Sequence, residues 1–163
     1  MASSDQCIVD GRTLNLNGTG YRRLFMVNVY KACLYTETKI SSERELYEFS
    51  APVRLHFEYL YGPISRDRIA GAWEDALRRV AHGDISMPLE TFLLTITDYQ
   101  KGDMVDYDIL PNEELRIRKN GKEAAVIRSR QFCCAVLDVV FGPEPIDKKL
   151  KDGLLSEAAV QVA

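Results

Sequence analysis

Histidine and long apolar runs are both scarce in this sequence of 163 residues. His56 and His82 are its two histidines, which gives little material for a metal centre or a His-based catalytic triad. The longest uninterrupted apolar run covers residues 132–137, whereas a membrane-spanning helix needs roughly 20 such residues. The sequence therefore predicts a soluble protein that uses no metal and no other cofactor.

An excess of charge of one sign is also missing. The chain has 21 Lys and Arg against 24 Asp and Glu, a formal net charge of −3, which argues against nucleic acid as a partner. Its 46% hydrophobic and 28% charged residues are typical of a globular protein. The length corresponds to about one domain, so we expect a single domain over residues 1–163.

The four cysteines show neither a C-x-x-C motif nor a zinc-like spacing with histidine. Cys133 and Cys134 are adjacent within an apolar stretch and are predicted to be core residues. A disulfide between Cys7 and Cys33 stays open, because spacing alone does not decide it. The first residues lack the basic and apolar regions of a signal peptide. We expect a cytoplasmic protein, or a periplasmic one whose signal has been removed.

Sequence motifs of the common catalytic and nucleotide-binding classes are absent. There is no G-x-S-x-G, no phosphate-binding loop and no H-E-x-x-H. The Gly18-x-Gly20 pattern fails as a dinucleotide loop because Arg23 stands where the third glycine belongs, so a turn is predicted there. The aspartates between 103 and 108 lack calcium-loop spacing and are predicted to be solvated strand residues.

Hydrophobic periodicity and turn residues predict alternating groups of strands and helices. Ser42, Ser65 and Pro88 each mark the start of a helix. Asn120-Gly121 predicts a tight hairpin between the last two strands. This order predicts an α+β fold with an antiparallel sheet. The predicted strands are 14–20, 24–35, 53–59, 104–110, 115–118 and 123–128, and the predicted helices are 42–49, 66–80, 88–96, 129–141 and 146–155.

Arg22, Arg23 and Tyr30 form the most informative polar group in the sequence. An Arg fork beside an apolar layer can bind a carboxylate or a phenolate through two hydrogen bonds, and a Tyr hydroxyl can add a third. A surface Arg pair with an interfacial Tyr is the alternative. In one straight strand, Arg22 and Tyr30 would lie roughly 27 Å apart. A shared ligand therefore requires a turn or bulge near residues 24–27.

Several of these segments, taken in order, resemble the chalcone isomerase superfamily. Residues 16–22, Leu-Asn-Gly-Thr-Gly-Tyr-Arg, resemble its opening motif, and residues 29–35, Val-Tyr-Lys-Ala-Cys-Leu-Tyr, its next strand. Lys101-Gly102-Asp103, Asn120-Gly121-Lys122 and residues 132–142 match bacterial chalcone isomerase-like proteins. The resemblance covers residues 14–155. It implies an open-faced β-sandwich, in which a large antiparallel sheet is backed by helices.

The resemblance also implies roles for individual residues. Arg22 aligns with the Arg that orients the substrate in plant chalcone isomerases, and Tyr30 with a Thr that helps to hold a catalytic water. The Tyr and Asn of the plant active site have no counterpart in residues 62–77, and a further Thr aligns with Val139. Most hydrogen-bonding groups of the isomerase site are thus replaced.

These substitutions favour the non-catalytic, fatty-acid-binding branch of the superfamily. The expected partner is a small hydrophobic carboxylate or phenolic ligand, bound by Arg22 and Tyr30 in an apolar cleft. One alternative is a chalcone isomerase-type cyclisation of an enone, in which Arg22 would be the electrophile and Tyr30 a replacement hydroxyl. Another alternative is a structural or partner-binding module that has no ligand cleft.

Overall fold

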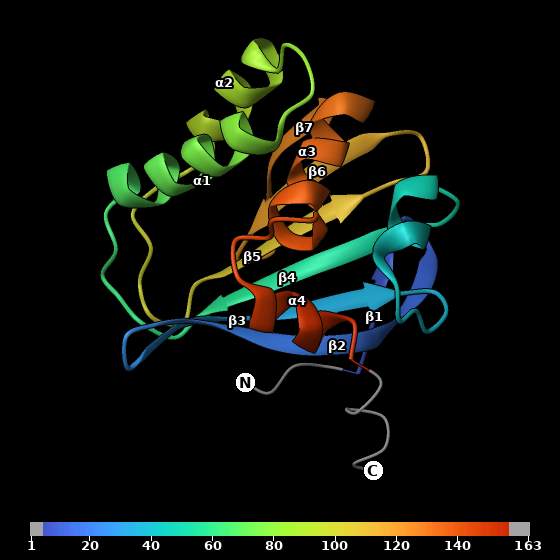
Figure 1. Cartoon of the computed structure of the whole chain (residues 1–163), viewed down its shortest axis with the longest axis horizontal. Helices are drawn as coiled ribbons and strands as arrows, with labels where there is room; N and C mark the ends of the chain where they lie inside the picture. The colour runs from blue at the N-terminus through green and yellow to red at the C-terminus, as the bar shows by residue number, and fades with distance from the viewer. Residues whose placement is uncertain (1–4, 157–163) are drawn as a thin grey trace.

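Seven antiparallel strands form one sheet in the computed structural model of the protein, which describes residues 5–156. The strand order in the sheet is the order in the chain, so each strand pairs with its sequence neighbours (Figure 1). The strands are β1 (Gln6–Val9), β2 (Arg12–Leu24), β3 (Val27–Thr36), β4 (Val53–Tyr59), β5 (Met104–Ile109), β6 (Glu114–Lys119) and β7 (Lys122–Arg128).

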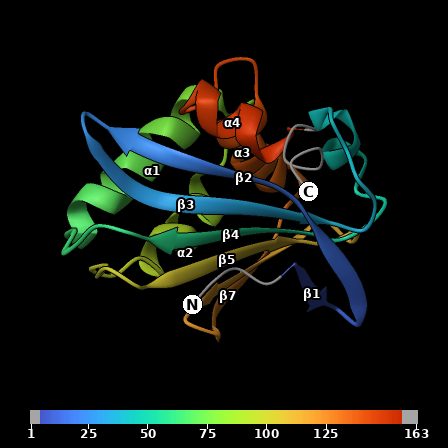
Figure 2. The same cartoon turned by 90° about the horizontal axis from the view of Figure 1, so that it is seen from below.

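The helices gather on one face of this sheet. They follow β3, β4 and β7 in the chain, and from below the strands lie in front of them (Figure 2). This arrangement confirms the expected α+β fold with a large antiparallel sheet backed by helices. The helical segments are the 3₁₀ helix η1 (Glu43–Glu48) and the α-helices α1 (Arg66–Val80), α2 (Ser86–Leu94), α3 (Arg130–Phe141) and α4 (Lys148–Leu154).

Local sequence signals explain where most of these elements begin and end. The hydroxyl of Ser65 accepts a hydrogen bond from the Arg68 N–H at the start of α1, and Ser129 caps α3 in the same way. Asn120 and Gly121 adopt positive φ angles of 50° and 83° in the β6–β7 turn, as predicted. The helix expected from Pro88 begins two residues earlier, at Ser86.

The predicted turn at Gly18-x-Gly20 is wrong, because β2 continues through both glycines. Because these two glycines have no side chain, α4 can pack closely against the strand. A Cβ at Gly18 would overlap the backbone oxygens of Gly153 and Leu154, so α4 could not lie this close to the strand. The buried Asn17 side chain holds the same contact by donating to the Leu154 carbonyl at 2.9 Å. Glycine here permits approach rather than a turn.

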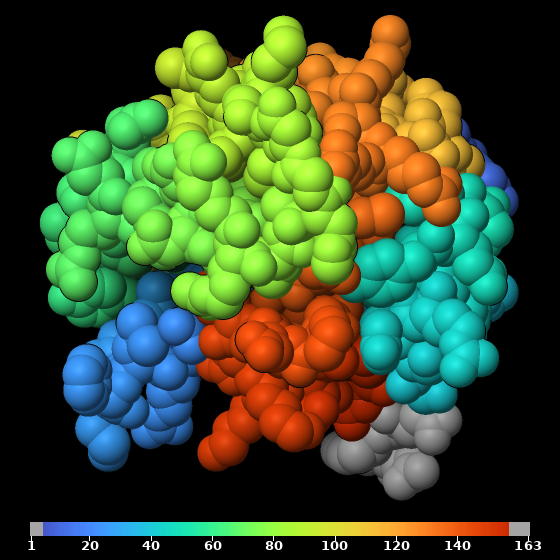
Figure 3. All heavy atoms as spheres, turned by 45° about the horizontal axis from the view of Figure 1, so that its top comes forward, coloured from blue at the N-terminus to red at the C-terminus, as the bar shows by residue number. Residues whose placement is uncertain are grey.

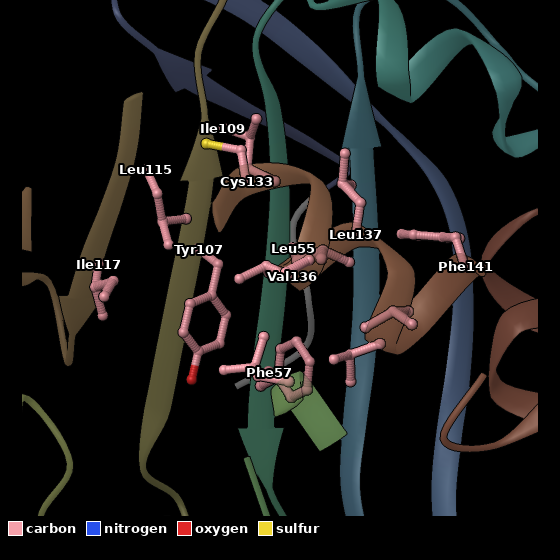
Figure 4. Close-up of a cluster of buried hydrophobic side chains, with 14 of the residues drawn as sticks. Leu55, Phe57, Tyr107, Ile109, Leu115, Ile117, Cys133, Val136, Leu137 and Phe141 are labelled. Atoms are coloured by element: carbon pink, nitrogen blue, oxygen red, sulfur yellow. The ribbon is translucent and has the colours of Figure 1, made fainter. Parts of the chain in front are cut away.

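The main core lies between the sheet and α3 (Figure 4). Leu55 and Phe57 of β4 and Tyr107 of β5 point toward Val136 and Leu137 of α3. In β4 every second residue is buried, and its bounds confirm the strand predicted over residues 53–59. Phe57 and Tyr107 pack edge to face, with ring centroids 5.4 Å apart.

The cysteines are thiols in this structure. Cys133 is buried in the main core, as expected, and Cys134 is half-buried beside it. No disulfide links Cys7 to Cys33. Cys33 belongs to a second, smaller core on the other face of the sheet, where Cys7 packs against it.

This second core is formed where β1 and the first part of β2 curl over the sheet, and β1 itself was not predicted. Asp108 lies near it and is buried, so its assignment as a solvated strand residue is wrong. The guanidinium of Arg54 donates to both Asp108 oxygens, at 2.7 and 2.9 Å. Burial nevertheless raises the pKa of Asp108 above its ordinary value.

Candidate functional site

A tight hairpin places Arg22 directly opposite Tyr30. The two residues are register partners in β2 and β3, and the last pair before the turn is Leu24 with Val27. The turn that a shared ligand requires is therefore present at residues 25–26. Directly opposed residues in an antiparallel pair project to the same face, with Cα atoms about 4.5–5.5 Å apart. The two candidate residues thus lie side by side.

Tyr30 faces the helix-covered side of the sheet. Its ring lies 4.7 Å from that of Phe57 and 5.5 Å from that of Tyr59, centroid to centroid. Burial raises the pKa of Tyr30 well above its ordinary value, although the charge of Arg22 acts in the opposite direction. The hydroxyl therefore stays protonated at neutral pH and can donate a hydrogen bond to an anion.

Arg22 reaches from β2 to the segment that joins α3 to α4. One of its terminal nitrogens, Nη1, donates to the carbonyl of Ile146 at 3.4 Å and to Oδ2 of Asp147 at 3.3 Å. The other oxygen of Asp147 caps α4 by accepting from the Leu150 N–H at 3.1 Å. Sequence reasoning missed Asp147, since 125 residues separate it from Arg22.

Two nitrogens of the Arg22 guanidinium remain able to donate hydrogen bonds to a ligand. Within residues 5–156, Nε and Nη2 make no hydrogen bond to protein, and no buried side-chain nitrogen or oxygen lacks a partner. These two nitrogens therefore contact solvent. Together they form the planar fork that matches a carboxylate. The arrangement leaves Arg22 able to bind a second anion beside Asp147.

A notch lies next to this pair. In Figure 3 the β2–β3 hairpin stands apart from α1 and from the C-terminal helices, and the surface is hollowed between them. Several partly buried apolar side chains pack against the edge of the core in this region of the chain fold. They come from β3, from α1 and from the segments before α1 and α4: Val29, Trp73, Ile64 and Ile146. A separate groove of about 410 Å³ lies between the C-terminal end of α1 and the first half of α3.

Three further tyrosines line the same face of the sheet and were not predicted as site residues. Tyr59 and Tyr99 have ring centroids 4.7 Å apart, and Tyr107 lies close enough to both that each affects its pKa. Burial raises the pKa of all three, that of Tyr99 to about 12. In the sequence Tyr59 and Tyr107 belong to predicted strands and Tyr99 lies between a predicted helix and a predicted strand, so no local signal marks their clustering.

The histidines lie elsewhere. Nδ1 of His56 is 2.6 Å from Oδ1 of Asp106, on the sheet face opposite Tyr30, and His82 follows the end of α1. Within the part of the chain that the structure describes, no three His, Cys, Asp or Glu side chains are placed to hold a metal ion. No helix there is long and apolar enough to cross a membrane.

Comparison with known proteins agrees with this architecture. Residues 1–156 match the family model described as chalcone isomerase-like. The chain belongs to the chalcone isomerase-like family. The family assignment confirms the resemblance seen in the ordered motifs of the sequence.

A fatty-acid-binding protein from Arabidopsis thaliana is similar to this member of the family in both sequence and structure. Fatty-acid-binding protein 1 is 22% identical over 122 residues, which cover 71% of this chain and 44% of that protein. The chain thus spans less than half of the length of this curated relative. The crystal structure of a fatty-acid binding protein superposes with a TM-score of 0.70 at 18% identity, covering 94% of this chain and 97% of the other. The structural likeness establishes a common fold.

Proposed function

We propose that this protein binds a fatty acid, or a similar apolar carboxylate, without catalysing a reaction. The observation that carries the proposal is the direct pairing of Arg22 with Tyr30 beside a hollow in the surface, at the edge of the apolar core. The relative that is named as a fatty-acid-binding protein supports it.

The proposed chemistry uses the donors that the site leaves open. Nε and Nη2 of Arg22 each donate a hydrogen bond to one carboxylate oxygen, and the protonated hydroxyl of Tyr30 donates a third. Charge-assisted bonds of this kind offset the loss of water around a carboxylate that enters an apolar site. The alkyl chain then lies in the notch against Val29, Ile64 and Ile146, where its burial contributes roughly 0.8 kcal/mol per CH₂ group.

Calorimetry with laurate, together with mass spectrometry of gently extracted protein, tests the proposal. We expect bound lipid or measurable laurate binding in the wild type, and at least about a tenfold weaker affinity in Arg22→Gln, because a charged hydrogen-bonding pair contributes about 1.5–3 kcal/mol. Arg23→Gln is the matched control, since it removes the same charge from the next residue. Tyr30→Phe keeps the ring packing and removes only the hydroxyl.

Two results would overturn the proposal. The first is a wild type that carries no lipid and does not bind laurate. The second is an Arg22→Gln variant that is folded and binds as tightly as the wild type.

The enone isomerase alternative is tested at the same site. Tyr30 stays protonated at neutral pH, so it would act there as a hydrogen-bond donor rather than as a phenolate base. Loss of chalcone absorbance measures the reaction directly. A rate above that of buffer which disappears in Arg22→Gln would establish catalysis and replace the binding proposal.

A further inference from the structure

The tip of the β2–β3 hairpin presents large apolar side chains to solvent. Phe25 is 99% exposed and Met26 is 82% exposed, and Leu24 and Val27 on either side of them are exposed as well. The hairpin stands apart from the helices in Figures 1 and 3. Contiguous apolar exposure of this kind marks an interaction site for a protein or a membrane.

The backbone at the tip makes this exposure harder to explain by folding alone. Phe25 has a φ of 57°, in the left-handed region that favours glycine. A bulky aromatic there strains the turn, while its exposed ring contributes nothing to the core. Phenylalanine at this position therefore strains the turn without gaining contacts in the core, and a contact outside the protein would account for it.

One cationic and one amphipathic side chain lie beside the tip. Arg23 is exposed and forms no ion pair within residues 5–156, in contrast to Arg22. Tyr61 is half exposed on the loop after β4. That loop lies beside the hairpin, since the Leu60 N–H donates to the Val29 carbonyl at 2.9 Å. A basic residue next to exposed apolar and tyrosine side chains matches the charge and polarity profile of an anionic membrane surface.

The small apolar area of the tip favours a membrane over a protein as its partner. A stable protein interface buries about 800 Å² on each side, and two large side chains offer roughly half of this area. Insertion into a bilayer needs no complementary surface, because the acyl chains adapt to the inserted groups. We propose that the β2–β3 tip inserts Phe25 and Met26 into the surface of an anionic lipid membrane, with Arg23 at the level of the headgroups.

This inference rests on the exposed tip and not on the ligand. Arg22 and Phe25 are separated by only two residues of β2, so a docked tip would also bring the proposed carboxylate site close to the lipid phase. Membrane binding and laurate binding nevertheless use different side chains. The two proposals can therefore fail separately.

Co-sedimentation with unilamellar vesicles tests the membrane proposal. We expect the wild type to bind vesicles of phosphatidylcholine with phosphatidylglycerol, and to bind phosphatidylcholine alone more weakly. Met26→Ser should lower the partition coefficient at least about tenfold, since burial of one such side chain is worth about that factor. Met87→Ser is the matched control, because Met87 is also 82% exposed but lies on α2; its partition coefficient should not change.

Two further variants separate insertion from misfolding and from surface charge. Phe25→Gly relieves the strained turn, so it should keep or raise the thermal midpoint while it weakens vesicle binding. Arg23→Gln should weaken binding to the anionic vesicles and leave laurate binding unchanged. Phe25→Gly with unchanged vesicle binding would overturn the proposal. So would sedimentation of the wild type as a dimer that Phe25→Gly dissociates, because a second copy of the chain would then be the partner of the tip.

Discussion

The carboxylate of Asp147 partly neutralises the positive charge of Arg22 at the candidate site. It lies within 3.3 Å of Arg22 and at the same time caps α4. A ligand carboxylate that binds Arg22 is repelled by this neighbour. We expect Asp147→Asn to bind laurate about three to ten times more tightly, corresponding to roughly 0.7–1.4 kcal/mol for a partly exposed charge. Asn is as good a helix cap as Asp, so α4 should keep its stability.

Calorimetry of Asp147→Asn beside the wild type measures this effect. Weaker or unchanged affinity would mean that the ligand does not meet the guanidinium of Arg22. Urea unfolding of both proteins serves as the control for the cap.

Single residues also show how far the sequence alone could define the site. Arg22 and Tyr30 could be paired in advance, because only a turn between them was needed. Asp147 could not be placed, since its contact depends on how α4 docks against β2 (Figure 1). The same holds for the three buried tyrosines, Tyr59, Tyr99 and Tyr107. Each faces inward in its own segment, and only the packing of distant segments brings them together.

Among the elements, the contact of α4 with β2 is the most sensitive to substitution. Gly18→Ala would place a methyl group into the backbone of α4 at Gly153 and Leu154. Because backbone cannot move aside as a flexible side chain does, we expect a loss of about 1–3 kcal/mol in the free energy of unfolding. Displacement of α4 should also change laurate binding, because it moves Ile146 relative to the proposed alkyl-chain position and Asp147 relative to Arg22.

Urea unfolding and calorimetry of this variant measure the two effects. Gly102→Ala is not a neutral control, because Gly102 has a φ of 96°. Gly71→Ala is the better comparison, since Gly71 lies within α1 and a Cβ there meets open space; this substitution should raise the free energy of unfolding by up to about 1 kcal/mol, because alanine favours a helix over glycine. Equal stability of Gly18→Ala and wild type would show that α4 is not held in this position.

Element by element, the sequence was most informative where the signal is local. Serine caps, the Asn-Gly turn and the alternation of β4 depend on a few neighbouring residues, and the structure contains each of them. The strand β1 has only four residues and is stabilised by pairing with β2, so it carries little signal of its own. The two glycines of β2 were misassigned because their reason lies in a helix at the far end of the chain.

For the whole molecule, the buried tyrosines and thiols predict a stability limit at alkaline pH. Burial raises the pKa of Tyr30, Tyr59 and Tyr107, and that of Cys133 to about 12. As the pH rises, the unfolded chain releases these protons first, so the folded state loses stability with increasing pH. The decline should begin near pH 9 with the thiols and steepen above about pH 10, by up to about 1.4 kcal/mol per pH unit for each tyrosine.

Urea unfolding at about pH 8 and about pH 10.5 measures the decline. Tyr30→Phe, which keeps the ring but has no proton to lose, should show a smaller difference between the two conditions. A free energy of unfolding that stays constant over this range would contradict the assigned burial of these hydroxyls.

The docking of α4 on β2 has a consequence for the order in which the protein is made. Every pair of neighbouring strands is adjacent in the chain, so the sheet can grow strand by strand during translation. Gly18 and Gly20 are synthesised before residues 148–154, which pack against them and leave the ribosome after all seven strands. Until then, Arg22 has neither Ile146 nor Asp147 beside it. The proposed ligand site is therefore completed only when the last helix of the described chain docks, although Arg22 already belongs to the second strand.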